Sequence, residues 1–171
     1  MVPELVSSDA KRLLLMVLYR SGRKPGASIA ELRKEFGDRL EELVEELNEK
    51  LAELGLRLHL LEEEGLAVIA PSEPVGDIKL SPLDSNAVAC LGILVGLFTA
   101  GRGVVKRSEF LEVASRKVGE AEAKICLGEL AREGYVKVKG DEIQLSWRAF
   151  FELDVEKLAE SLAREVLKLS G

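Results

Sequence analysis

Histidine and cysteine, which serve in many catalytic and metal sites, are rare in this 171-residue sequence. It contains one histidine, His59, and two cysteines, Cys90 and Cys126, and these are not spaced as metal ligands are. We find no glycine-rich phosphate loop and no nucleophile elbow, and the carboxylates are scattered along expected helix surfaces. We therefore predict a protein that is not an enzyme and that has no metal or cofactor.

The three residues have simple structural interpretations. Cys90 and Cys126 lie within apolar patterns of helical spacing, which indicates buried thiols in a reducing compartment. His59 alternates with leucines in an expected strand, which indicates a half-exposed strand position. The N-terminus lacks the charged and apolar regions of a signal peptide, so we expect a cytoplasmic protein with no membrane segment.

The charged residues argue weakly against a protein that mainly grips nucleic-acid phosphates. The net charge is −6. An expected helix at residues 38–54 carries seven acidic and two basic residues, and another at 119–133 carries four acidic and two basic ones. The third helix of a helix-turn-helix domain enters the major groove, and both helices have the wrong sign for that. Their acidic faces are either simply solvated or meet a protein partner.

Small basic groups remain elsewhere in the chain. They either keep the surface soluble or make weak, salt-sensitive contacts with a phosphate backbone. The candidates for such nucleic-acid contact are Arg23, Lys24, Arg102, Lys106, Arg107, Lys137 and Lys139.

Hydrophobic spacing predicts the elements that position these residues. In the first half of the chain, three helices precede a β-hairpin, which is the element order of a winged helix. Ser28 and Glu31 form a capping box for the second helix. We expect helices at 11–19, 29–36 and 38–54 and strands at 56–60 and 66–70.

The same order returns in the second half. A shift of 79 positions superposes Leu51 and Gly55 on Leu130 and Gly134. We expect helices at 84–99, 106–117 and 119–133 and strands at 135–139 and 142–146. The core candidates of the last helix are Ala123, Ile125, Cys126, Leu127 and Leu130. We predict an α+β, mainly helical fold of tandem winged-helix domains at 1–71 and 81–153, a linker at 72–80 and a C-terminal helix at 154–171.

An uncharged segment at residues 87–100 is the centre of this arrangement. As a helix it would span about 21 Å, which is too short for the ~30 Å hydrocarbon core of a membrane. It is apolar on every side, so it must be covered on every side, by this chain alone or partly by another subunit. In the second case Gly92 and Gly96 would allow a close approach of backbones, beside Leu91 and Val95.

An aromatic cluster follows the second hairpin. Trp147, Phe150 and Phe151 either pack against the second wing or form an exposed partner-binding patch. Asp154 then caps the expected C-terminal helix, whose apolar stripe begins at Val155.

In these features the chain resembles the kleisin-interacting tandem winged-helix elements, which accompany SMC chromosome-organising ATPases. Segregation and condensation protein B and the winged-helix non-SMC elements belong to this family. The local likeness is to the second winged helix of the non-SMC element that carries a RING finger. Its glycine-aromatic pair matches Gly134-Tyr135, and its Arg-containing, Glu-Leu-ending segment matches Arg148 and Glu152-Leu153. No zinc-binding Cys/His cluster follows, so the resemblance does not extend to ubiquitin-ligase activity.

The resemblance implies a homodimer that captures a kleisin segment in an SMC complex for chromosome segregation, associated with the nucleoid. DNA contact would be weak or indirect. The alternative is a DNA-binding transcription regulator or a basal-factor-like module, because the fold alone does not separate these classes. Abundant Glu, Lys and Arg beside a single Gln also suggest a thermophilic source.

Overall fold

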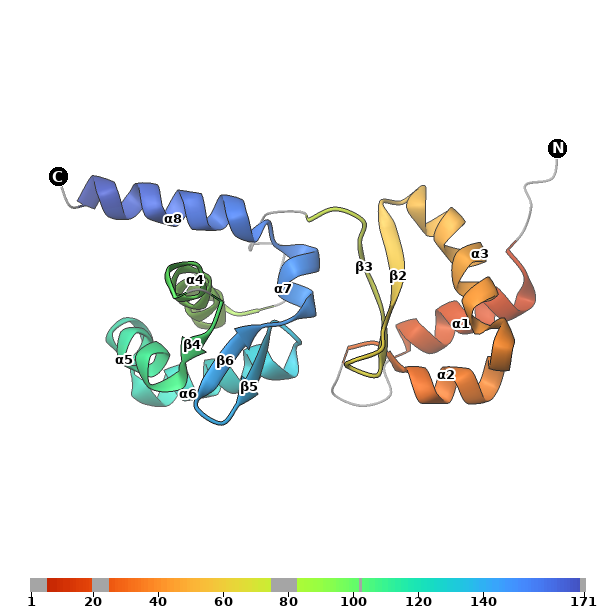
Figure 1. The fold of residues 1–171 in the computed structure, drawn as a ribbon, viewed down its shortest axis with the longest axis horizontal. Helices are drawn as coiled ribbons and strands as arrows, with labels where there is room; N and C mark the ends of the chain where they lie inside the picture. Colours follow the sequence, from red (N-terminus) through yellow and green to blue (C-terminus); the bar gives the residue numbers. More distant parts are fainter. Residues whose placement is uncertain (1–5, 20–24, 75–82, 102, 170–171) are drawn as a thin grey trace. The chain divides into compact units, whose positions relative to one another are not determined.

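Both halves of the chain fold as helices followed by a β-hairpin (Figure 1). We describe them from a computed structural model, which covers residues 6–19, 25–74, 83–101 and 103–169. The chain divides into two compact units, Met1–Glu73 and Pro74–Gly171, and each has its own hydrophobic core. This architecture confirms the predicted α+β, mainly helical class.

Unit 1 folds as a winged helix. Its helical elements are α1 (Ser8–Leu18), α2 (Ile29–Phe36), the 3₁₀ turn η1 (Gly37–Arg39) and α3 (Leu40–Ala52). Its strands β1 (Ala27–Ser28), β2 (Leu56–Leu61) and β3 (Leu66–Pro71) form an antiparallel sheet in the order β1-β3-β2. Leu13, Leu32 and Leu40 are fully buried where the helices meet.

Side chains fix where the helices of unit 1 begin. The Ser7 hydroxyl accepts a hydrogen bond from the Ala10 N–H at the start of α1. The Ser28 hydroxyl accepts one from the Glu31 N–H, as expected from the capping pattern. Gly37, at φ 57°, ends α2, and the turn that follows delays the start of α3 to Leu40.

Asn48 attaches α3 to the edge strand of the wing. Its side-chain amide donates to the Leu58 carbonyl (3.1 Å), and its side-chain oxygen accepts from the Leu58 N–H (2.7 Å). The strand order leaves β2 at the edge of the sheet, where backbone groups have no neighbouring strand. Asn48 therefore satisfies both backbone groups of a buried residue and orients α3 with its opposite face outward.

Unit 2 repeats this plan and adds two helices. Its helices are α4 (Ser85–Ala100), α5 (Arg107–Val118), α6 (Glu120–Arg132), α7 (Trp147–Glu152) and α8 (Val155–Leu169). Its strands β4 (Val105–Lys106), β5 (Val136–Lys139) and β6 (Glu142–Leu145) form an antiparallel sheet in the order β4-β6-β5.

The start of α5 differs from the expectation. The sequence suggests a cap near Arg107 or Ser108, whereas the helix begins at Arg107 after Lys106, whose side chain makes no capping hydrogen bond. Lys106 belongs to β4, so the chain passes directly from strand to helix. Asp84 caps α4, at the start of the expected helix, since its carboxylate accepts from the Ala87 N–H at 2.8 Å. Residues 75–80 of the predicted linker lie outside the described residues.

We predict that Asn48→Ala destabilises unit 1 by about 1–3 kcal/mol, because it leaves a buried N–H and C=O of β2 without their partner. Urea denaturation followed by circular dichroism measures the free energy of unfolding. Glu49→Ala, at the exposed neighbouring position, is the control and should change that free energy by less than about 0.5 kcal/mol. Equal stability of the two variants would contradict the role given to Asn48.

Candidate protein-interaction site

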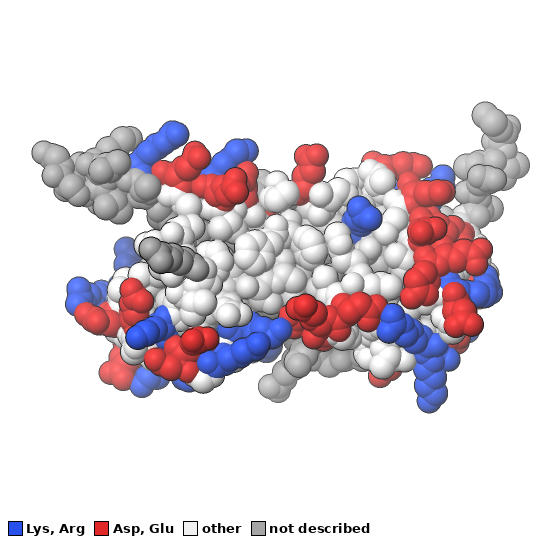
Figure 2. All heavy atoms as spheres, in the orientation of Figure 1, with Lys and Arg blue, Asp and Glu red and all other residues white. Residues whose placement is uncertain are grey.

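The outward face of α3 is acidic (Figure 2). Glu42, Glu45 and Glu49 are exposed and make no ion pair within the described part of the chain. Neighbouring Glu41 lies 3.7 Å from Arg33, and Glu53 lies 3.4 Å from Lys50, so other carboxylates on the helix are partly compensated. Three uncompensated carboxylates on the helix that a DNA-reading domain inserts into the groove would repel phosphates.

One carboxylate of α3 has a structural role. Glu46 accepts hydrogen bonds from the Ser7 backbone N–H and from the Ser7 hydroxyl, the latter at 2.8 Å. These bonds favour the charged form, so the pKa of Glu46 lies below its ordinary value. Glu46 thus ties the start of α1 to α3 and does not belong to the outward acidic face.

The equivalent helix of unit 2 is less acidic on its surface. Glu120 pairs with Lys124 at 2.7 Å, and Glu133 pairs with Arg148 at 3.0 Å. Ile125, which the sequence suggested as a core residue, is instead 62% exposed. The buried stripe of α6 contains Ala123, Cys126, Leu127 and Leu130, and Ile125 falls outside this three-and-four spacing.

The basic candidates form no uninterrupted cationic surface among the residues that the structure describes. Lys106, Arg107 and Lys139 are exposed and Lys137 is half-buried. Glu142 of β6 is the register partner of both Lys106 and Lys139, which places a carboxylate between these cations. Arg23, Lys24 and Arg102 lie outside the described residues.

The central helix α4 is fully buried on one side and only partly buried on another. Leu91 and Val95 have no exposed surface and belong to the core of unit 2, so they lie in the interior instead of on a surface open to a partner. Gly92 and Gly96 are half-buried, and a Cβ atom at Gly92 would meet no other atom within 4 Å. Only the glycine side of the predicted contact surface is therefore accessible.

The three aromatic candidates also differ in their exposure and in the side chains that they contact. Trp147 and Phe151 are half-buried, with ring centroids 6.3 Å apart. Trp147 packs on Gly134, where an added Cβ atom would lie 2.9 Å from the indole. Phe150 is 48% exposed and packs edge-to-face on Phe98 of α4, with centroids 6.2 Å apart. Phe150 alone among the three is a large exposed apolar side chain.

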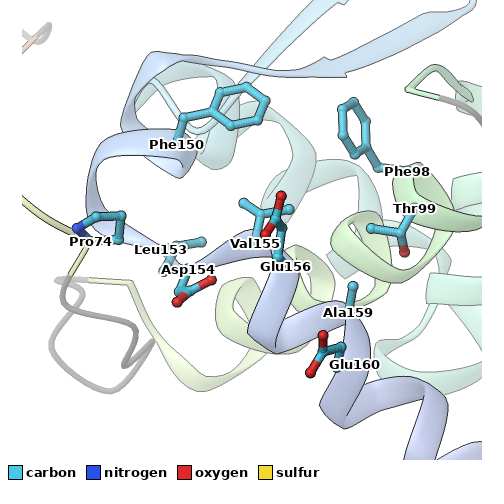
Figure 3. Close-up of a pocket in the computed structure, with 10 residues that line it drawn as sticks. All are labelled: Pro74, Phe98, Thr99, Phe150, Leu153, Asp154, Val155, Glu156, Ala159 and Glu160. Atoms are coloured by element: carbon cyan, nitrogen blue, oxygen red, sulfur yellow. The ribbon is translucent and has the colours of Figure 1, made fainter.

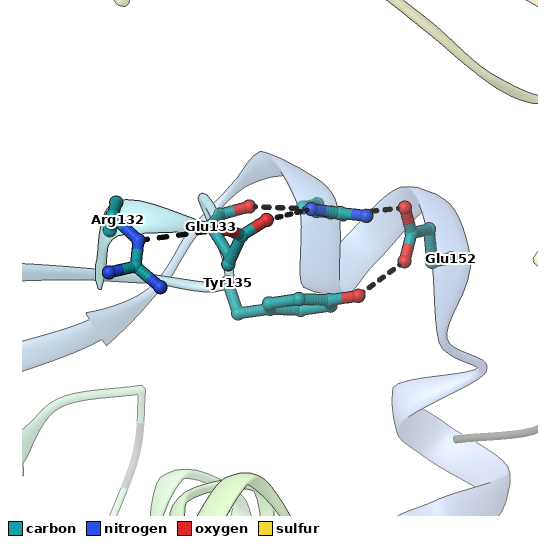
Figure 4. Close-up of polar contacts among 5 residues, drawn as sticks. Arg132, Glu133, Tyr135 and Glu152 are labelled. Atoms are coloured by element: carbon teal, nitrogen blue, oxygen red, sulfur yellow. Dashed lines mark hydrogen bonds and ion pairs between the residues drawn. The ribbon is translucent and has the colours of Figure 1, made fainter. Parts of the chain in front are cut away.

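A buried cation, Arg148, joins α7 to the end of α6. Arg148 donates from Nε to Glu152 (2.7 Å) and from an Nη atom to the Glu133 carboxylate (3.0 Å) and backbone carbonyl (3.1 Å). Its guanidinium lies 4.8 Å from the centroid of the Tyr135 ring, whose hydroxyl donates to Glu152 at 2.6 Å (Figure 4). Three of the residues that carry the family resemblance, Tyr135, Arg148 and Glu152, thus meet in one network.

Arg132 lies 3.7 Å from Glu133, so two cations, Arg132 and Arg148, meet the two carboxylates of this network. Burial would lower the pKa of Arg148, but the hydrogen bond and charge of Glu152 outweigh that effect and raise the pKa. The guanidinium also lies at the carboxyl end of α6, where the helix dipole favours a cation. Arg148 is therefore charged and has a structural role. In the sequence, only the family resemblance had singled out this residue.

An open pocket of about 640 Å³ lies in unit 2 beside α4, α7 and α8 (Figure 3). Phe98 and Phe150 contribute aromatic rings, and Asp154, Glu156 and Glu160 contribute carboxylates. The remaining lining residues are Pro74, Thr99, Leu153, Val155 and Ala159. Phe150 is the one predicted partner-binding residue among the described residues that line this pocket. The sequence pattern did not indicate that the other nine lining residues would form a site.

Comparison with known proteins supports the fold. No protein-family model matches the sequence, and no curated protein does. A chain of a solved Nse1-Nse3-Nse4 complex shares the fold. The TM-score is 0.67 at 15% identity, over 96% of this chain and 93% of that chain. The likeness therefore includes both units and is consistent with a fold like that of the kleisin-interacting tandem winged-helix elements.

Other kinds of site find no support among the described residues. No group of three or more His, Cys, Asp or Glu side chains there could hold a metal ion. No described helix is both long and apolar enough to cross a membrane. Cys90 and Cys126 are free thiols, both fully buried.

We predict that Arg148→Met destabilises unit 2 by about 3–5 kcal/mol, because two partly buried carboxylates lose a buried cation. Glu152 then has no ion pair among the described residues, and Glu133 keeps only a longer one of 3.7 Å with Arg132. Arg116→Met is the matched control, since Arg116 makes an ion pair of 2.7 Å with Glu112 but is 75% exposed. It should cost less than about 0.5 kcal/mol. Urea unfolding measures both values, and similar losses in the two variants would refute the structural role of Arg148.

We also predict that neither cysteine reacts with Ellman's reagent in the folded protein. Burial raises the pKa of Cys90 and raises that of Cys126 to about 12, so almost no reactive thiolate exists at neutral pH. Both should react once guanidinium unfolds the chain. Leu54→Cys, at a position that is 74% exposed, should react at once and serves as the positive control. Rapid labelling of the native thiols would show that unit 2 opens readily.

Proposed function

We propose that this protein is a non-catalytic adaptor that binds a kleisin subunit in an SMC complex for chromosome segregation. The likeness to a chain of the Nse1-Nse3-Nse4 complex, across 96% of this chain, is the observation that carries the proposal. The adaptor would act as a homodimer at the nucleoid in the cytoplasm.

The chemistry of the surface supports a protein partner. α3 presents Glu42, Glu45 and Glu49 where a DNA-reading domain presents cations. Unit 2 adds exposed apolar side chains, Ile125 and Phe150, which suit contact with another polypeptide.

The second candidate function is a DNA-binding regulator. Lys106, Arg107 and Lys139 favour it, because they are exposed at or beside the second sheet. Direct DNA contact through them would be weak, since Glu142 lies in register with two of the three.

Binding to the kleisin encoded in the same genome tests the proposal. We expect a stable complex of the two purified proteins in size-exclusion chromatography with light scattering, and a dimeric mass for the adaptor alone. A monomer that binds neither the kleisin nor the SMC subunit would overturn it.

Duplex affinity separates the two functions. At about 0.15 M salt we expect only non-specific binding, with a Kd of about 10⁻⁴ M or weaker. Replacing Glu42, Glu45 and Glu49 together by Lys should strengthen binding to a random duplex at least about tenfold, because it removes the repulsion on α3. Tight, sequence-dependent binding of the unmodified protein, weakened by this triple substitution, would favour the regulator.

A further inference from the structure

The described residues that line the pocket of unit 2 are mostly apolar, and those that carry a charge are all acidic. Pro74, Phe98, Phe150, Leu153, Val155 and Ala159 form its apolar lining. Thr99 adds a hydroxyl that donates back to the Val95 and Gly96 carbonyls of its own helix, both at 2.9 Å. The polar groups left to meet a ligand are carboxylates.

Among the described residues that line the pocket there are three carboxylates and no lysine or arginine. Asp154 is engaged with Lys157, through the backbone N–H at 3.1 Å and Nζ at 3.2 Å. Glu160 lies 3.8 Å from Arg164. Glu156 is exposed and makes no ion pair in the described part of the chain, so its charge is available to a cation from outside.

The size of the pocket suits part of a polypeptide. About 640 Å³ falls within the range of roughly 300–1,000 Å³ that is typical of ligand pockets. An amphipathic segment fills such a space with anchors from one of its faces. The small side chain of Ala159 lines the pocket from α8 and leaves room for an anchor.

We propose that this pocket is the docking site for a segment of the kleisin that carries large apolar side chains flanked by lysine or arginine. This inference rests on the proposed adaptor function and adds the place and chemistry of the contact. The apolar side chains pack against Phe98 and Phe150, and the cationic flank meets Glu156. Complementary charge orients the segment and speeds its association.

Three substitutions in the full chain test the pocket, with the purified kleisin from the same genome as the probe. Ala159→Phe fills the pocket, Phe150→Ala removes an exposed wall, and Glu156→Lys reverses the free charge. Isothermal titration calorimetry gives the Kd, and thermal unfolding checks that each variant is folded. We expect Ala159→Phe and Phe150→Ala to weaken binding at least about fivefold, as substitutions of central anchors do.

Glu156→Lys should weaken binding by about threefold to tenfold at low salt and by less at high salt, because salt screens an exposed charge. Matched controls are Ala121→Phe and Glu63→Lys, at exposed positions outside the pocket, and they should keep the Kd within about twofold.

The outcomes distinguish the pocket from the adaptor function. If the unmodified protein does not bind the kleisin, the proposed function fails and the pocket assignment fails with it. If it binds and the folded pocket variants bind equally well, the docking site is elsewhere and the adaptor function stands. Equal losses in the pocket variants and the controls would also overturn the assignment. Should Ala159→Phe fail to fold, Phe150→Ala and Glu156→Lys decide.

Discussion

The position of the C-terminal helices depends on one buried cation, Arg148. It joins Glu133 at the end of α6 to Glu152 at the end of α7, with the Tyr135 ring beside it. Because α8 begins three residues after Glu152, this network also sets where α8 starts. Removing the cation would leave Glu152 without an ion pair among the described residues and Glu133 with only the longer, 3.7 Å pair to Arg132. The pocket beside α7 and α8 therefore depends on an ion-pair network that does not line it.

The helix without charges, α4, imposes the second constraint on unit 2. A helix that is apolar all round must be covered on every side, and the core of unit 2 covers the side of Leu91 and Val95. The C-terminal helix α8 contacts α4 and covers more of it, while Phe98 near the end of α4 lines the pocket. Part of the apolar surface that remains accessible, at Phe98 and Phe150, thus lies beside carboxylates. This combination suits a cationic, apolar polypeptide better than a nucleic acid.

Acidic residues have two different roles in the molecule. Glu46, Glu133 and Glu152 hold elements together through specific hydrogen bonds to Ser7, Arg148 and Tyr135. Glu42, Glu45 and Glu49 contact no cation in the described residues, so they cost stability through mutual repulsion. This repulsive cluster lies on the helix that DNA-reading helix-turn-helix domains insert into the groove, and it is the reason for proposing a protein partner there.

Periodicity within the sequence determined the helices, the two hairpins and their repetition, because these depend on contacts near in the chain. Helix 29–36 was predicted to the residue, and the Asp84 and Asp154 caps follow from local hydrogen bonding. Strands β1 and β4 were missed because two-residue strands have no periodicity and exist only by pairing with β3 and β6. Ile125 was misplaced because an apolar residue was assumed to be buried, whereas only its neighbours share the buried face.

The tertiary structure alone decided which of the candidate residues meet. Glu133, Arg148 and Glu152 form one network because the β5-β6 hairpin folds back and returns α7 to the end of α6. Phe98 and Phe150 are 52 positions apart, yet they form one wall of the pocket with residues of α8. By itself the sequence determined the kind of fold and the sign of charge on its helices. It could not place the pocket, because the contacts between α4, α7 and α8 depend on how these helices pack. Contacts of this kind produce no regular spacing of residues in the sequence.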